Sequence, residues 1–175
     1  ASTLNRAWAV KDSFATLDLA PLGFEALFDA EWIWRDATPA AGTDAEGAVW
    51  RNVATATVLE EWERAWRDNG SPSDRPVFLP ELLSDPTIAL FGAYRGESLV
   101  GGCAANVSSE AVGFSNFFAA DGDTEPLGAG ALAAVSTFGV GLPVVGYERG
   151  QELERARRMG FRSVGPLRVW LCDRA

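Results

Sequence analysis

Residues 125–130 read Glu125-Pro126-Leu127-Gly128-Ala129-Gly130 and stand between an aromatic stretch, 112–118, and an apolar stretch, 127–138. The aromatic stretch predicts a β-strand and the apolar stretch a buried helix. Small residues where a strand turns into a helix let backbone N–H groups approach a ligand closely. The helix N-terminus adds about half a positive charge. The hexapeptide therefore predicts a site suited to a phosphate or pyrophosphate.

Two residues of the hexapeptide oppose such a site. Pro126 has no N–H to donate, and Glu125 already brings a negative charge to the first helical turn. If the carboxylate pointed at a phosphate about 4 Å away, the repulsion would be ~1 kcal/mol in water and ~4 kcal/mol at an effective dielectric constant of 20. Alternatively, Gly128 and Gly130 only let a buried helix pack closely on a sheet. A retained anion site and plain helix packing both stay open.

Hydrophobic periodicity and turn residues place the other elements along the chain. We expect strands at 27–35, 49–53, 88–94, 99–107, 112–119, 142–147 and 161–171, the last one interrupted at Gly165-Pro166. We expect helices at 58–69, capped by Thr55 or Thr57, at 127–138 and at 150–159, and a helical turn at 79–83. This order predicts one α+β domain over residues 49–175, with an N-terminal extension, residues 1–48, packed on it.

Composition excludes several classes of function. The 175 residues contain no histidine, which removes His-based catalysis and the commonest zinc ligand, and no cysteine pair has metal-ligand spacing. We therefore expect no metal. The net charge of −9 disfavours nucleic acid as a partner. The chain has no 18-residue apolar run and no leader, so we expect a cytoplasmic protein without a membrane partner, with Cys103 and Cys172 as free buried thiols.

The order of elements, together with two motifs, resembles the GNAT superfamily of acyl-CoA N-acyltransferases over residues 49–171. The hexapeptide is similar to the family's Q/R-x-x-G-x-G/A motif, with Gly128 and Gly130 in register and Glu125 where Gln or Arg would stand. The second motif, RARRMGF at 155–161, looks like the family's helix that ends in Gly-Phe. The resemblance implies a three-layer α/β/α fold with a mixed, mostly antiparallel central sheet flanked by helices.

The resemblance also implies acetyl-CoA or another acyl-CoA as cosubstrate, and a small-molecule or protein amine as acceptor. The CoA pyrophosphate would lie on amides of the loop and first helical turn. The pantetheine arm would pair like an extra strand with the strand ending near Ala119, which must then separate from the strand at 142–147. The binding residues implied are Phe118, Ala119, Gly128, Ala129, Gly130 and Ala131.

Catalytic residues are harder to assign by resemblance. In the family a carboxylate or a water chain removes the amine proton, and a tyrosine often protonates the leaving thiolate. Four residues before Gly160, where that tyrosine often stands, this chain has Ala156. Tyr147 is the nearby phenol, and Glu148 and Asp121, at predicted strand ends, are the candidate bases. Each acid also fits the role of a solvated loop residue.

Two further features have alternative interpretations. The arginines at 149–168 either attract CoA phosphates or form a solvated helix face with a Glu154–Arg158 pair. Ser115 and Asn116, polar residues inside an aromatic strand, bind either neighbouring backbone or a ligand if they are buried. At the level of the whole chain, three hypotheses stay open: an acyl-CoA N-acyltransferase, a non-catalytic GNAT-like binding module, and a homodimer formed through the sheet edge and N-terminal hairpin.

Overall fold

The computed structural model describes residues 8–37, 47–69, 76–122 and 124–172. The chain divides into two compact units, one made of Ala1–Trp34 with Gly146–Ala175 and the other of Arg35–Val145. In chain order the described elements are β1 (Trp8–Asp12), η1 (Ala20–Leu22), β2 (Glu25–Arg35), β3 (Val49–Asn52), α1 (Ala56–Asp68), η2 (Pro80–Ser84), β4 (Ile88–Arg95), β5 (Ser98–Val107), β6 (Val112–Ala119), η3 (Glu125–Leu127), α2 (Gly128–Phe138), β7 (Val144–Glu148), α3 (Gly150–Arg158) and β8 (Arg162–Cys172). The predicted α+β class is confirmed.

In the second unit the strands follow the order β7-β6-β5-β4-β3. The pairs β3–β4, β4–β5 and β5–β6 are antiparallel, whereas β6 and β7 are parallel. A turn around Gly96, which has a positive φ of 61°, joins β4 to β5 as predicted. The strands are therefore mixed and mostly antiparallel, which confirms the expected sheet type.

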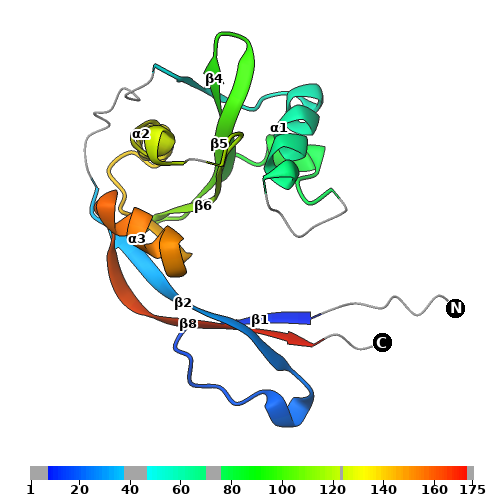
Figure 1. Ribbon diagram of the computed structural model, residues 1–175, viewed down its shortest axis with the longest axis vertical. Coiled ribbons are helices and arrows are strands. Elements are labelled where there is room, and N and C mark those ends of the chain that lie inside the picture. Colours follow the sequence, from blue (N-terminus) through cyan, green and yellow to red (C-terminus); the bar gives the residue numbers. More distant parts are fainter. Residues whose placement is uncertain (1–7, 38–46, 70–75, 123, 173–175) are drawn as a thin grey trace, which may run out of the picture. The chain divides into compact units, whose positions relative to one another are not determined.

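Two neighbouring glycines of β5 show that helices cover both faces of this unit. A Cβ on Gly101 would overlap Leu127, which precedes α2, and a Cβ on Gly102 would overlap the indole of Trp62 in α1. Because successive residues of a strand point to opposite faces, α2 and α1 pack on opposite sides of β5. Figure 1 shows the two helices on either side of β4, β5 and β6. The predicted three-layer α/β/α arrangement is confirmed.

Helix α1 begins at a capped threonine and buries aromatic side chains. Thr55 Oγ1 accepts a hydrogen bond from the Val58 amide at 3.3 Å, so Thr55, and not Thr57, is the N-cap. Trp62 is fully buried and donates its indole N–H to the Phe91 carbonyl at 2.9 Å. Its ring meets those of Phe78 and Phe118 edge-on, with centroids 5.0 and 5.3 Å away. These contacts form the core between α1 and the sheet.

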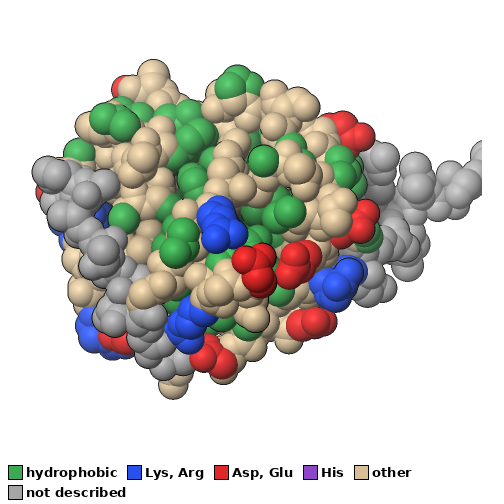
Figure 2. All heavy atoms as spheres, turned by 90° about the horizontal axis from the view of Figure 1, so that it is seen from above, with side chains coloured by type: hydrophobic (Ala, Val, Ile, Leu, Met, Phe, Trp, Pro, Cys, Tyr) green, Lys and Arg blue, Asp and Glu red, His purple; other side chains and the backbone are tan. Residues whose placement is uncertain are grey.

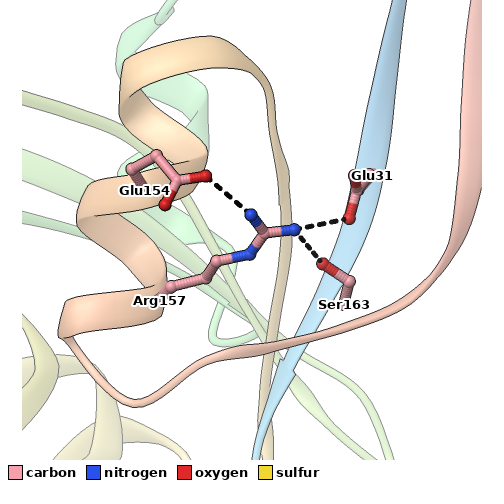
Figure 3. Close-up of polar contacts among 4 residues, drawn as sticks. All are labelled: Glu31, Glu154, Arg157 and Ser163. Carbon is pink, nitrogen blue, oxygen red and sulfur yellow. Dashed lines mark hydrogen bonds and ion pairs between the residues drawn. The ribbon is translucent and has the colours of Figure 1, made fainter.

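In the first unit β8 lies between β1 and β2 and pairs antiparallel with both (Figure 1). Helix α3 is joined to these strands by Arg157, whose guanidinium donates to Glu154, Glu31 and Ser163 (Figure 3). The N-terminal stretch thus supplies two partners for the last strand. Of these, β2 was predicted as 27–35, whereas β1 was not predicted.

Two expectations about strands need correction. The strand expected at 142–147 is β7, which runs from Val144 to Glu148 and so begins two residues later. The last strand is not interrupted at Gly165-Pro166. Instead β8 runs continuously, and the register with β2 shifts where Trp32 pairs with Gly165 and Ile33 with Ser163. A β-bulge keeps the strand paired around a proline that cannot donate a ladder hydrogen bond.

Candidate functional site

The pairing between β6 and β7 is short. It is recorded at Val112–Val144 and Gly113–Val145, at the start of both strands, and the Val112 amide donates to the Pro143 carbonyl at 2.9 Å. Strand β6 continues to Ala119 and remains paired with β5 there. Within the second unit, the edge of β6 that faces away from β5 therefore lies outside the recorded ladder from Phe114 onward.

A bulge in β6 accompanies this change. Between the pairs Gly102–Phe118 and Ala104–Ser115, Cys103 alone on β5 faces both Asn116 and Phe117 on β6. Asn116 has a positive φ of 52°, a conformation that asparagine tolerates better than most residues. Ser115 and Asn116 are exposed and bonded to each other at 3.1 Å, so neither is the buried polar group considered above. The polar pair marks the bulge, which the sequence analysis missed.

The hexapeptide forms a 3₁₀ turn, η3, followed directly by α2. The Leu127 amide donates to the Thr124 carbonyl at 3.1 Å, and the Gly128 amide donates to the Glu125 carbonyl. Pro126 has no N–H, so three of the amides expected to face an anion are absent or used within the turn. The N-cap of α2, Leu127, provides no side-chain acceptor. The amides of Ala129 and Gly130 belong to the first turn, whose N–H groups lack intrahelical partners, whereas the Ala131 amide, four residues after the N-cap, bonds within the helix.

The two motif glycines do not play the same part. Gly130 is buried, and a Cβ there would overlap Trp50 Nε1 and lie 2.7 Å from Trp50 Cδ1. Its missing side chain is therefore used for packing against β3. Ala129 and Glu125 are exposed, whereas Gly128 and Ala131 are buried. The donors present fit a phosphate in part, through the first α-helical turn and not through the η3 turn.

The three candidate catalytic residues fall into both units. Asp121 is exposed in the turn after β6, in the same unit as the hexapeptide. Tyr147 and Glu148, at the end of β7, belong to the first unit. The rings of Tyr147 and Trp32 meet edge-on, with their centroids 5.7 Å apart. The Lys11 ammonium lies 4.4 Å from the centroid of the Tyr147 ring. Burial, with a smaller contribution from nearby Glu152, raises the pKa of Glu148 to about 7.

The binding residues implied by the resemblance all lie in the second unit. Phe118 and Ala119 are buried at the end of β6, and Phe118 packs on Trp62. Ala119 and Leu127 belong to one buried cluster, so the end of β6 and the start of α2 are packed together. The structure thus brings the predicted strand end and the helix N-terminus to one place within this unit.

The basic segment is largely paired with carboxylates. Arg155 binds Glu152 at 2.7 Å, and Arg157 binds Glu154 at 2.6 Å, a pair in place of the expected Glu154–Arg158. Arg168 holds Asp29 with two hydrogen bonds, at 2.6 and 2.9 Å, which lower the pKa of that carboxyl. Figure 2 shows acidic and basic side chains mostly side by side on the face drawn. These pairs favour the interpretation as a solvated helix face.

Other groups add no site to those described. Cys103 and Cys172 are buried free thiols, as predicted. In the part of the chain that the structure covers, no cluster of three or more acidic, cysteine or histidine residues could hold a metal ion. None of the described helices has both the length and the apolar character needed to cross a bilayer.

Comparison with solved structures identifies the fold. The chain is similar to a functionally unknown conserved protein from Staphylococcus epidermidis, with a TM-score of 0.73 and 13% identity over 97% of this chain and 73% of that one. It is similar to a putative acetyltransferase from the GNAT family from Novosphingobium aromaticivorans, with a TM-score of 0.65 and 13% identity over 97% of this chain and 75% of that one. It is also similar to a GCN5-related N-acetyltransferase from Kribbella flavida, with a TM-score of 0.63 and 15% identity over 90% of this chain and 63% of that one.

No protein-family model and no curated protein matches the sequence. At 13–15% identity, the structural likeness establishes the fold alone. The chain has the GNAT fold, as the sequence motifs predicted.

Proposed function

We propose that this GNAT-fold chain binds an acyl-CoA and transfers the acyl group to an amine. The observation that carries the proposal is the end of the β6–β7 ladder after Val112–Val144 and Gly113–Val145, while β6 runs on to Ala119. An extended amide-bearing arm can pair with such a strand edge as an added strand. The bulge at Asn116 supports this, because bulges bend a strand away from its neighbour.

In this proposal Phe118 and Ala119 line the pantetheine arm, and the first turn of α2 binds the pyrophosphate. The donors are the amides of Ala129 and Gly130, which are aided by the positive end of the helix dipole. Glu125 is exposed beside that turn and would repel phosphate oxygens. We therefore expect weaker CoA binding than an intact set of loop amides would give.

Glu148 is the proposed general base. An acid whose pKa lies near 7 is deprotonated for a useful fraction of molecules at neutral pH and still accepts a proton readily. The acceptor would be a neutral amine whose proton goes to the Glu148 carboxylate. Tyr147, the phenol that the resemblance implied as proton donor, points to the opposite face of β7. The protonated Glu148 carboxyl is therefore the proposed donor to the leaving thiolate, and Asp121 is the second candidate base.

A non-catalytic binding module is the alternative function. It is favoured by the two hexapeptide amides that bond within the η3 turn and by the use of Gly130 for packing against Trp50. Under this hypothesis the N-terminus of α2 keeps the backbone shape of the family's binding motif but binds no CoA. A protein or small molecule would then bind elsewhere on the chain.

Isothermal titration with acetyl-CoA and with CoA tests the proposal. We expect binding in the wild type and binding about tenfold tighter in Glu125→Gln, because one repulsive charge is removed. Glu110→Gln, a change of an exposed acid in the β5–β6 turn, is the matched control and should leave the affinity unchanged. Undetectable heat at millimolar ligand would exclude the transferase. Binding without turnover of a panel of amines would favour the alternative.

A further inference from the structure

Two cations of the first unit rest on aromatic rings of one sheet face. The Lys11 ammonium is 4.4 Å from the centroid of the Tyr147 ring, and the Arg149 guanidinium is 4.5 Å from that of Phe28. Lys11 is the only lysine of the chain. Both cations are exposed, and both contacts lie within the distance at which a cation is attracted by a ring.

Three rings on this face form an aromatic floor. Phe28, Trp32 and Tyr147 are half-buried and pack on a small buried cluster made of Ala30, Leu167 and Val169. Val169 of β8 pairs with Lys11 on one side and with Phe28 on the other, so these side chains stand on the same face. The floor therefore combines apolar area accessible to solvent with two positive charges above it.

These two charges are not neutralised by carboxylates. Among the residues that the structure describes, neither Lys11 nor Arg149 has an acidic side chain within ion-pair distance. The nearby acids are engaged elsewhere: Asp29 with Arg168, Glu31 with Arg157, Glu152 with Arg155, and Asp12 with the amides of Phe14 and Leu17.

Glu148 and Asp12 are the acids closest to this pair in sequence. Glu148 follows Tyr147 of the floor, Asp12 follows Lys11, and side chains alternate across a strand. Glu148 and Asp12 therefore point to the opposite face.

We propose that the floor of Phe28, Trp32 and Tyr147, with Lys11 and Arg149 above it, binds a small organic anion. The ligand class is a carboxylate or phosphate carried on a planar apolar body. The anionic group binds the Lys11 ammonium and the Arg149 guanidinium, and the planar body packs on Trp32, since the rings of Tyr147 and Phe28 carry the two cations. Neither half suffices alone, because exposed ion pairs and half-exposed ring faces are each weak.

This inference goes beyond the proposed function, because it concerns residues of the first unit alone and requires no CoA. The two proposals can therefore fail separately.

Titration of the full chain with benzoate and with phenyl phosphate, without CoA, tests the inference. Acetate tests the need for a ring, and benzylamine tests the sign of the charge. Lys11→Met and Arg149→Met remove one charge each and keep most of the apolar stem. Arg51→Met is the matched control, because Arg51 lies over Tyr94 in the second unit, 5.2 Å from its ring centroid.

We expect benzoate or phenyl phosphate to bind with a Kd of about 1 mM. Each of the two variants should weaken binding about tenfold, the effect of losing one charge-assisted hydrogen bond. Arg51→Met should bind as the wild type does, and the affinity should fall with added salt. Which anion binds more tightly distinguishes carboxylate from phosphate recognition.

Four results would overturn the inference. They are acetate binding as tightly as benzoate, benzylamine binding more tightly than benzoate, the same loss of affinity in Arg51→Met, and no detectable binding of either aryl anion. Circular dichroism of each variant shows whether it is folded. If Lys11→Met does not fold, the Arg149→Met titration and the salt dependence still decide the matter.

Discussion

Gly130 packs its backbone against the indole of Trp50, leaving no room for a side chain. A Cβ at this position would overlap Trp50 Nε1 and lie 2.7 Å from Cδ1. The second glycine of the motif that identifies the fold is therefore required by a contact with β3. Packing therefore explains why a glycine stands at this position, whether or not a ligand binds.

Gly130→Ala is therefore expected to destabilise the protein by about 1–3 kcal/mol, the usual cost of overpacking. In an unhindered helix the same change would stabilise by up to about 1 kcal/mol. Urea unfolding measures the difference. In a Trp50→Leu background the alanine should cost less, which gives a coupling energy in a double-mutant cycle. An equal cost in both backgrounds would show that the contact with Trp50 is not the cause.

Glu63 holds the segment after the first α-helix. This carboxylate is 5% exposed and accepts the backbone amides of Val77 and Phe78. Glu63→Ala leaves two N–H groups without their acceptor and should cost about 2–4 kcal/mol of unfolding free energy. Glu63→Gln keeps an acceptor oxygen and should cost less. Glu60→Ala, a change of an exposed residue on the same helix, should alter the unfolding free energy by no more than about 0.5 kcal/mol. A similar loss in both alanine variants would contradict the role given to the Glu63 hydrogen bonds.

Glu148 makes stability depend on pH. Its pKa is raised from 4.5 to about 7 in the folded chain, so the folded state holds a proton that the unfolded state has already released. The titration of Glu148 leaves the unfolding free energy unchanged below about pH 4.5. It lowers that free energy as the pH rises to about 7, by up to about 3 kcal/mol. Glu148→Gln removes this dependence. Urea unfolding from pH 4 to 8 should show the wild type losing stability relative to the variant, and a constant difference would contradict the raised pKa.

Arg157 connects α3 to two strands but is 43% exposed. Its bonds to Glu154, Glu31 and Ser163 measure 2.6, 3.3 and 3.2 Å. Because exposed ion pairs contribute little, Arg157→Met should cost no more than about 1 kcal/mol, and less in 1 M salt. In Arg157→Lys the single ammonium cannot reach all three partners, so the variant should lose part of this stabilisation. A loss that high salt leaves unchanged would indicate a packing role for the side chain.

Most elements of the second unit could be predicted from the sequence because their signals are local. The cap at Thr55, the turn at Gly96 and the apolar runs of β4 and β5 depend on nearby residues. Strand β1 could not be predicted, because its partner β8 lies about 160 positions away and pairing such distant segments depends on tertiary structure. The bulge at Asn116 had a signal, an asparagine inside an aromatic strand, which was interpreted as a buried polar group.

The candidate site was predicted less completely than the fold. The motif identified the strand end and the helix N-terminus, which do pack together around Ala119 and Leu127. It did not reveal that Leu127 and Gly128 use their amides within the η3 turn. Such hydrogen bonds depend on local backbone geometry that small residues and proline leave open.

Hydrogen exchange with and without acetyl-CoA tests the central claim most directly, that an acyl-CoA pairs with the edge of β6 that faces away from β5. The account predicts slower exchange of the amides in residues 112–119 and 127–131, and unchanged exchange in the outer strand β3. Slower exchange at β3 alone, or no change anywhere at millimolar acetyl-CoA, would contradict it.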